Sequence, residues 1–146
     1  RACVSSCILL LASCASVYGD PNTVKLNAQL TGMQEVPSNP SMGKGMVEAS
    51  FNKETNELTW TVTYSGLSGP AVAGHFHGPA AAGVNAGVAL GFKGPLDSPI
   101  KGSAMLSAEQ AKDLLAGKWY VNLHTKVSPG GEVRGQVLPA AQRSAY

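Results

Sequence analysis

The chain has 146 residues, of which 44% are hydrophobic and 14% charged, and its formal net charge is +2. This length and composition fit one compact domain with a sizeable core. The charge is small and forms no run of lysines or arginines, which excludes an electrostatic surface for nucleic acid.

Residues 1–19 resemble a secretory signal peptide. An apolar run at 8–12 follows Arg1, and it is too short to span a membrane as a helix. Residues 11–14, Leu-Ala-Ser-Cys, also resemble a bacterial lipobox, in which Cys14 would carry a lipid anchor and make the only membrane contact we expect. Simple signal cleavage and lipidation both stay open. Either route predicts an exported domain that is periplasmic, secreted or lipid-anchored.

The positions of the cysteines exclude several kinds of site from the body of the chain, the part that follows the leader. All three lie in the leader, at positions 3, 7 and 14. The body therefore has no disulfide and no thiol nucleophile. A blue-copper site of the cupredoxin type is excluded, because it requires a cysteine ligand.

Residues 23–138 are expected to form one domain, followed by a C-terminal tail at 139–146. The many glycines and prolines favour turns, and the clearest strand alternates Leu58, Trp60 and Val62 with threonines. Ser107 and Gln110 have the spacing of a helix capping box. Strands are expected at 24–30, 42–51, 58–64, 71–77, 87–92, 100–106, 119–125 and 132–138. The pattern predicts an all-β fold, a single antiparallel, Greek-key-like β-sandwich or barrel with one short helix near 107–116. The residues expected in its core include Trp60, Val62, Phe76, Val121, Leu123 and Val133.

The chain contains three histidines, and their positions suggest a metal site. His75 and His77 flank Phe76, so a strand would point both imidazoles to one face and Phe76 to the other. His124 ends a later strand. Two imidazoles on one strand face and a third from a distant segment are typical of copper and zinc sites in β-proteins. We therefore predict copper, with zinc as the alternative; separate structural hydrogen bonds are the competing interpretation.

The register of the last two strands follows from placing both apolar sets inward. His124 and Arg134 then point outward, on the face of His75 and His77, where the loop 78–87 could cover them. The seven-residue connection leaves a slip of one residue open. The predicted pairs are Leu123 with Val133, Asn122 with Arg134, and His124 with Glu132.

Arg134 is the candidate catalytic residue of this face. Its cation could steer a small anionic oxidant towards an open metal ion. The alternative is a surface ion pair with Glu132 or Glu35, and Glu132 is expected to be a solvated strand residue. Tyr120 and Asn122 share the outward face of their strand with the third histidine and are candidates for supporting the ligands.

Four short motifs together resemble the CHRD domain, a module first named from chordin. They are residues 35–37 (Glu-Val-Pro), 74–79 (Gly-His-Phe-His-Gly-Pro), 122–125 (Asn-Leu-His-Thr) and 130–136 (Gly-Gly-Glu-Val-Arg-Gly-Gln). The resemblance covers nearly all of residues 24–138. It implies an all-β exported domain and defines no activity, although chordin's extracellular signalling role implies a protein partner.

The segment His75-Phe76-His77 is also similar to the His-x-His copper pair of copper–zinc superoxide dismutases. That resemblance implies His124 as a third ligand and Arg134 as the arginine beside the copper. The chain departs from the pattern because it has no fourth histidine and no histidine-rich zinc loop. Water or another oxygen ligand would have to complete the shell.

Two functions remain open. One is an exported copper protein that acts as a redox enzyme on superoxide or a related small oxidant. The other is a non-catalytic extracellular protein-binding module whose metal is purely structural. Hydrolase and nucleotide-binding functions are disfavoured, since the sequence has no nucleophile elbow and no phosphate-loop fingerprint.

Overall fold

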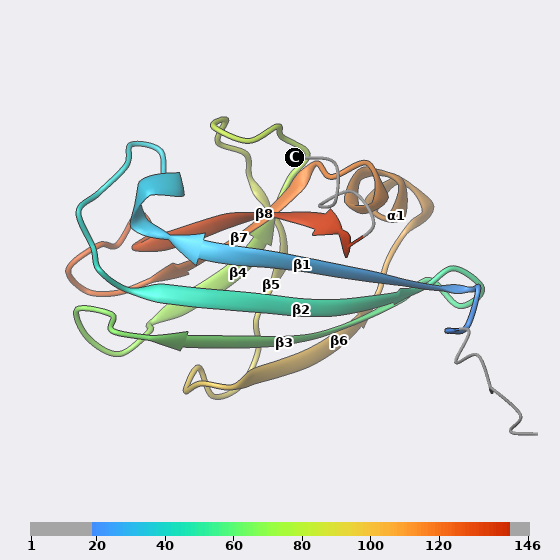
Figure 1. The fold of residues 1–146 in the computed structure, drawn as a ribbon, viewed down its shortest axis with the longest axis horizontal. Coiled ribbons are helices and arrows are strands. Elements are labelled where there is room, and N and C mark those ends of the chain that lie inside the picture. Colours follow the sequence, from blue (N-terminus) through green and yellow to red (C-terminus); the bar gives the residue numbers. More distant parts are fainter. Residues whose placement is uncertain (1–18, 141–146) are drawn as a thin grey trace, which may run out of the picture.

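The computed structural model describes residues 19–140, and most of them belong to one antiparallel sheet (Figure 1). All but the last residue of the predicted leader, 1–19, and all but the first two residues of the predicted tail lie outside the described residues, and so does Cys14. A 3-10 helix, η1 (Gly32–Gln34), follows the first strand, and one α-helix, α1 (Ala108–Leu115), precedes the seventh. The eight strands are β1 (Thr23–Thr31), β2 (Lys44–Asn52), β3 (Glu57–Ser65), β4 (Ala73–His77), β5 (Val88–Gly91), β6 (Ile100–Met105), β7 (Trp119–His124) and β8 (Val133–Pro139).

The sheet has the order β5-β4-β7-β8-β1-β2-β3-β6 and curls into a half-barrel. The curl brings the two ends of the sheet together across the core. Trp60 of β3 meets Phe76 of β4 with 5.2 Å between ring centroids, although four strands separate β3 from β4 in the sheet. Phe92, which follows β5, contacts both rings. The all-β prediction with one short helix is confirmed, and the strands form one curled sheet.

Alternation along each strand builds the core. The six residues predicted to be buried are all at most 6% exposed. Ser107 caps α1 as predicted, because its hydroxyl accepts from Gln110 N at 3.1 Å and the Gln110 side chain accepts from Ser107 N at 3.0 Å. The helix buries Ala111 and Leu114 against the core, and each fully buried large apolar side chain contributes roughly 1.5–3 kcal/mol.

The strands β4, β7 and β8 lie side by side, and their register is the one predicted. Leu123 pairs with Val133 and Asn122 pairs with Arg134, without a slip. Gly135 helps to fix β8 against β1, since a Cβ at that position would overlap the backbone of Gln29. The outward residues of these three strands therefore share one convex face.

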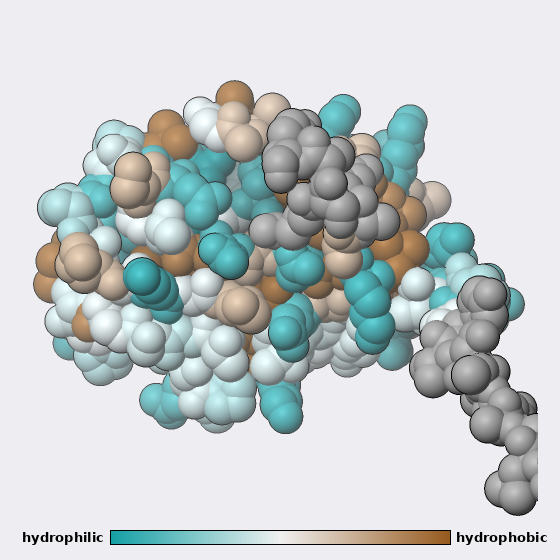
Figure 2. All heavy atoms as spheres, viewed as in Figure 1, coloured by the Kyte–Doolittle hydropathy of each residue, from teal (hydrophilic) through white to brown (hydrophobic). Residues whose placement is uncertain are grey.

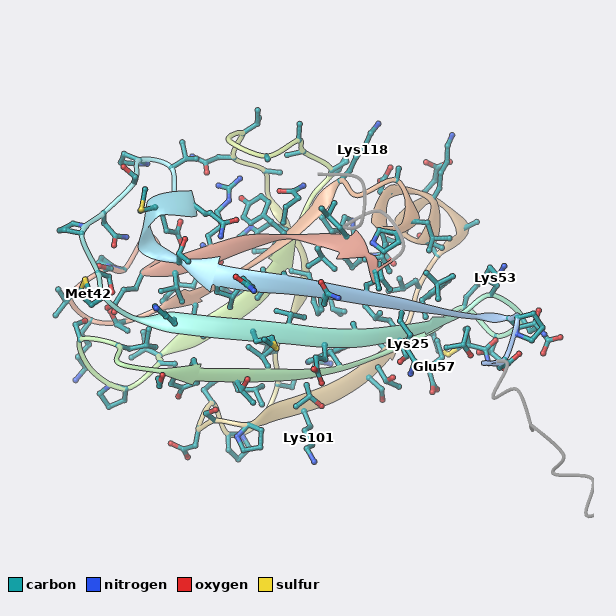
Figure 3. All side chains as sticks on the ribbon, viewed as in Figure 1. Lys25, Met42, Lys53, Glu57, Lys101 and Lys118 are labelled. Atoms are coloured by element: carbon teal, nitrogen blue, oxygen red, sulfur yellow. The ribbon has the colours of Figure 1, made fainter. Side chains whose placement is uncertain are left out.

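The surface of the described residues mixes polar and apolar side chains (Figure 2). Labelled lysines such as Lys53, Lys101 and Lys118 project at well-separated places (Figure 3). Within residues 19–140, no helix has the length and apolar character needed to cross a membrane.

Candidate metal centre

The three histidines converge on the convex face. The pairing of β4 with β7 places Ala73 opposite His124 and His75 opposite Asn122. His124 is therefore a diagonal neighbour of His75, while His77 lies two residues further along β4. One ring nitrogen from each histidine lies within 4.8 Å of the others. The predicted convergence is confirmed.

The closest pair already has the spacing of two ligands on one ion. His75 Nδ1 and His124 Nε2 are 3.2 Å apart. Two nitrogens that each lie about 2.0–2.1 Å from a tetrahedral zinc or copper ion are about 3.3 Å apart. The same spacing also suits a hydrogen bond when one of these nitrogens carries the proton. A metal ion could therefore enter with little movement of these two rings.

Backbone carbonyls fix the orientation of two of the rings. His124 Nδ1 lies 2.8 Å from Pro129 O, and His77 Nδ1 lies 3.0 Å from Ala86 O. A carbonyl oxygen only accepts, so both Nδ1 atoms carry the proton and donate. This arrangement leaves the Nε2 lone pair of each ring for an ion, as is usual for metal-binding histidines.

Burial favours the neutral form of two of the three imidazoles, those of His75 and His77. Burial lowers the pKa of His75, and the neighbouring His124 and His77 lower that pKa further. Burial also lowers the pKa of His77, although its hydrogen bonds with Ala86 and Asn122 act in the opposite direction. Both imidazoles are therefore neutral at pH 7, the state that a metal ligand requires.

Tyr120 supports His77 from the neighbouring strand. The two rings stack with 4.8 Å between centroids and 5° between planes. The Tyr120 hydroxyl donates to Ala86 O and accepts from Ala86 N, both at 3.1 Å. Tyr120 thus orients one ligand and ties down the loop 78–87 that covers this face.

Arg134 points outward as predicted, but it is not on the surface. It is only 2% exposed, with its guanidinium 3.5 Å from the centre of the Tyr120 ring. Nη1 donates to Asn85 Oδ1 and Nη2 donates to Val84 O, both at 2.7 Å. Since β7 separates β8 from β4, the Tyr120 ring stands between Arg134 and His77. This environment suits a residue that holds the covering loop.

Glu132 corrects one expectation. It is 1% exposed and not a solvated strand residue. Its carboxylate accepts from Thr125 Oγ1 at 2.7 Å, from Ser41 Oγ and Ser68 N at 2.9 Å each, and from Ser68 Oγ. The connections that carry these donors fold over the Glu132 carboxylate. Strand alternation alone does not show that a side chain is covered in this way.

Glu35 is a second buried carboxylate, and sequence reasoning considered it only as an ion-pair partner. It is 6% exposed, and its buried Oε1 has no hydrogen-bond partner among residues 19–140. Burial raises its pKa to about 7, against smaller opposing effects of the Arg134 charge, the Asn122 amide and the Val36 backbone. The sequence does not show that this carboxylate is buried beside outward-facing polar residues. Only the folded structure shows it.

Glu35→Gln is expected to stabilise the protein at pH 8 and to change little at pH 4.5. Because the folded pKa is raised, the stabilising contribution of Glu35 is fully present below pH 4.5 and is lost as the pH rises through about 7. The gain at pH 8 has an upper limit of about 3 kcal/mol. Urea unfolding at the two pH values measures it, with the exposed Glu48→Gln as the matched control. An equal effect on stability at both pH values would contradict the raised pKa of Glu35.

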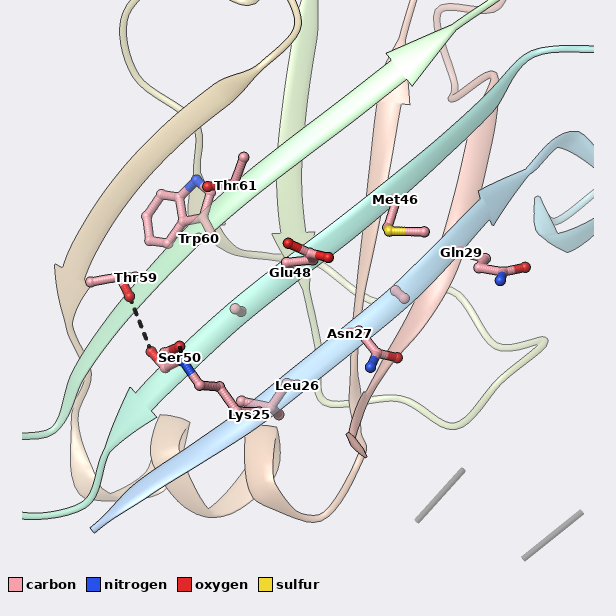
Figure 4. A pocket seen from close by; sticks show the side chains of 12 residues that line it. Lys25, Leu26, Asn27, Gln29, Met46, Glu48, Ser50, Thr59, Trp60 and Thr61 are labelled. Carbon is pink, nitrogen blue, oxygen red and sulfur yellow. Dashed lines mark hydrogen bonds between the residues drawn. The ribbon is translucent and has the colours of Figure 1, made fainter. Parts of the chain in front are cut away.

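A surface hollow lies away from the histidines. It has a volume of about 760 Å³ and lies over β1, β2 and β3 (Figure 4). Outward polar side chains line much of it, including Lys25, Glu48 and Thr59. The residues that line this hollow form no group of metal ligands or nucleophiles. The histidine cluster therefore remains the candidate functional site.

A family comparison covers most of the chain. The model of the CHRD domain matches residues 26–137, which include all three histidines. Searches among curated proteins and among solved structures gave no match. The similarity to copper–zinc superoxide dismutases therefore rests on the spacing of His75 and His77 and on the cluster they form with His124. The chain belongs to the CHRD domain family.

Proposed function

We propose that this CHRD domain binds one copper ion through His75, His77 and His124, with zinc as the alternative ion. The observation that carries the proposal is the convergence of three ring nitrogens within 4.8 Å. Two of the rings also present an oriented Nε2 lone pair. Copper is favoured because imidazole sites bind Cu(II) more tightly than other divalent first-row ions.

The redox form of the proposal is that the copper ion reacts with superoxide or a related small oxidant in an exported protein. Partial exposure of His75 and His124 supports access of a small molecule to the ion. A copper ion that alternates between Cu(II) and Cu(I) would oxidise one superoxide to dioxygen and reduce the next, with two protons, to hydrogen peroxide. The alternative is an extracellular protein-binding module in which the metal only stabilises the fold.

Metal analysis of the purified protein tests the proposal. After loading with Cu(II) and removal of loosely bound ions, we expect one copper per chain and an EPR spectrum with nitrogen couplings from imidazoles. Retention of neither copper nor zinc would overturn the proposal. Superoxide consumption by the copper-loaded protein, compared with the metal-free protein, then separates an enzyme from a protein with a structural metal.

Arg134→Ala is expected to weaken copper binding about 10-fold. This is in the range typical for the loss of a residue that orients a metal ligand without contacting the metal. The reason is that Arg134 holds residues 84 and 85 of the loop that orients His77. Arg134→Lys should not restore the copper affinity, because an ammonium group cannot replace a guanidinium that donates through two nitrogens. Copper competition titrations and limited proteolysis of the loop measure these effects.

The steering hypothesis for Arg134 gives a different result. The alanine variant would keep its copper but react more slowly with superoxide, most of all at low salt, and lysine would restore the rate. The two variants therefore separate a positioning role from electrostatic steering.

A further inference from the structure

The side chain of Asn122 lies beside His77 of the histidine cluster. It stands opposite His75 in the pairing of β4 with β7 and is 4% exposed. Its carbonyl oxygen Oδ1 is 2.9 Å from His77 Nε2. This oxygen therefore faces the same nitrogen that the backbone contact of His77 leaves free for an ion.

Both ring nitrogens of His77 face an oxygen atom, Nδ1 that of Ala86 and Nε2 that of Asn122. A neutral imidazole has a single N–H. His77 uses it on Nδ1, which faces the oxygen of Ala86. Nε2 then presents a lone pair to Asn122 Oδ1, and two acceptors at 2.9 Å repel each other unless a cation lies between them.

Glu35 fixes the direction of the Asn122 amide. The amide nitrogen Nδ2 lies 2.6 Å from the point where a Cβ on Gly131 would stand, and Glu35 Oε1 lies closer still to that point. An NH2 group donates and the oxygens of an ionised carboxylate only accept, so ionised Glu35 keeps Nδ2 towards itself and Oδ1 towards the histidines. Reversing the amide would instead place its oxygen against the carboxylate.

We propose that Asn122 Oδ1 is the fourth ligand of the metal ion, beside His75, His77 and His124. The inference rests on the proposed metal site and deepens it. Two neighbouring ligands that each lie about 2.0–2.1 Å from an ion at a right angle are about 2.9 Å apart. That is the separation found between Asn122 Oδ1 and His77 Nε2. Three imidazole nitrogens and one amide oxygen form a ligand set that suits Cu(II).

Asn122→Ala tests the assignment in the copper-loaded full chain. We expect its Cu(II) affinity to fall by about 10-fold or more. Added imidazole should then occupy the vacated position and give a fourth nitrogen coupling in the EPR spectrum, which it does not do in the wild type. Gln136→Ala is the matched control, because Gln136 is an outward amide of the neighbouring strand whose side chain, within the part of the chain that the structure describes, donates to Ala80 O and Gly117 O and to no histidine. The control should keep the wild-type spectrum.

Asn122→Asp covers the case in which the alanine variant does not fold. The aspartate keeps an oxygen in place and adds a negative charge, so copper should remain bound with a lower g∥ value. An unchanged g∥ in this variant, or wild-type affinity and spectrum in Asn122→Ala, would overturn the assignment of Asn122. Failure of the wild type itself to bind copper would instead overturn the proposed function.

Discussion

Replacing His124 with alanine is expected to abolish stoichiometric copper binding while the fold persists. His124 supplies one of the two nitrogens that already have the spacing of shared ligands, 3.2 Å apart. Without it, His75 and His77 form an incomplete site on one strand. Its side chain is only half-buried and points away from the core, so the loss of stability should be small. Copper per chain after dialysis against a weak chelator measures the effect.

Thermal unfolding gives a second measurement of the same change. An ion that binds only the folded state raises the unfolding temperature of the wild type. Added copper should therefore stabilise the wild type and have no specific effect on His124→Ala, His75→Ala or His77→Ala. Thr61→Ala, on the outward face of β3, is the control and should bind copper like the wild type. Retention of one tightly bound copper by His124→Ala would refute the three-histidine site.

The elements could be predicted because local patterns determine them. Leu58, Trp60 and Val62 alternate with threonines, and the alternation assigns both the strand and its buried face. The register of β7 with β8 followed from matching two apolar sets, and it is correct. Which strands face each other across the curled sheet could not be predicted, because alternation does not say that β3 would meet β4 across the core.

The convergence of the three histidines could be predicted and their surroundings could not. Strand alternation placed His75 and His77 on one face, and the register added His124. Alternation says which way a side chain points but not what covers it. Arg134 was therefore predicted on the correct face, while its burial under the loop 78–87 was missed. The burial of Glu132 was missed for the same reason.

The carboxylate of Glu132 joins three connections between strands. Ser41 precedes β2, Ser68 follows β3, and Thr125 follows β7; each donates to Glu132. Burial alone would raise the pKa of Glu132, but the hydrogen bonds from Ser68, Thr125 and Ser41 outweigh it and hold the pKa below its ordinary value of 4.5. Glu132 is therefore ionised in the folded protein at neutral pH. It fixes the start of the connection that supplies Pro129 O to His124.

Glu132→Ala is expected to lower the free energy of unfolding by at least about 3 kcal/mol at pH 7. Hydrogen bonds to a buried charge contribute about 1.5–3 kcal/mol each, and the variant would leave the donors unsatisfied. The unfolding temperature should fall by about 10 °C. Because the folded pKa is lowered, this contribution is present above pH 4.5 and is lost as the pH falls through the folded value, so wild type and variant should converge in acid. Urea unfolding between pH 3 and pH 7 measures the difference, with the exposed Glu48→Ala as control. A constant difference across this range would show that Glu132 stabilises the loops by packing and not by its charge.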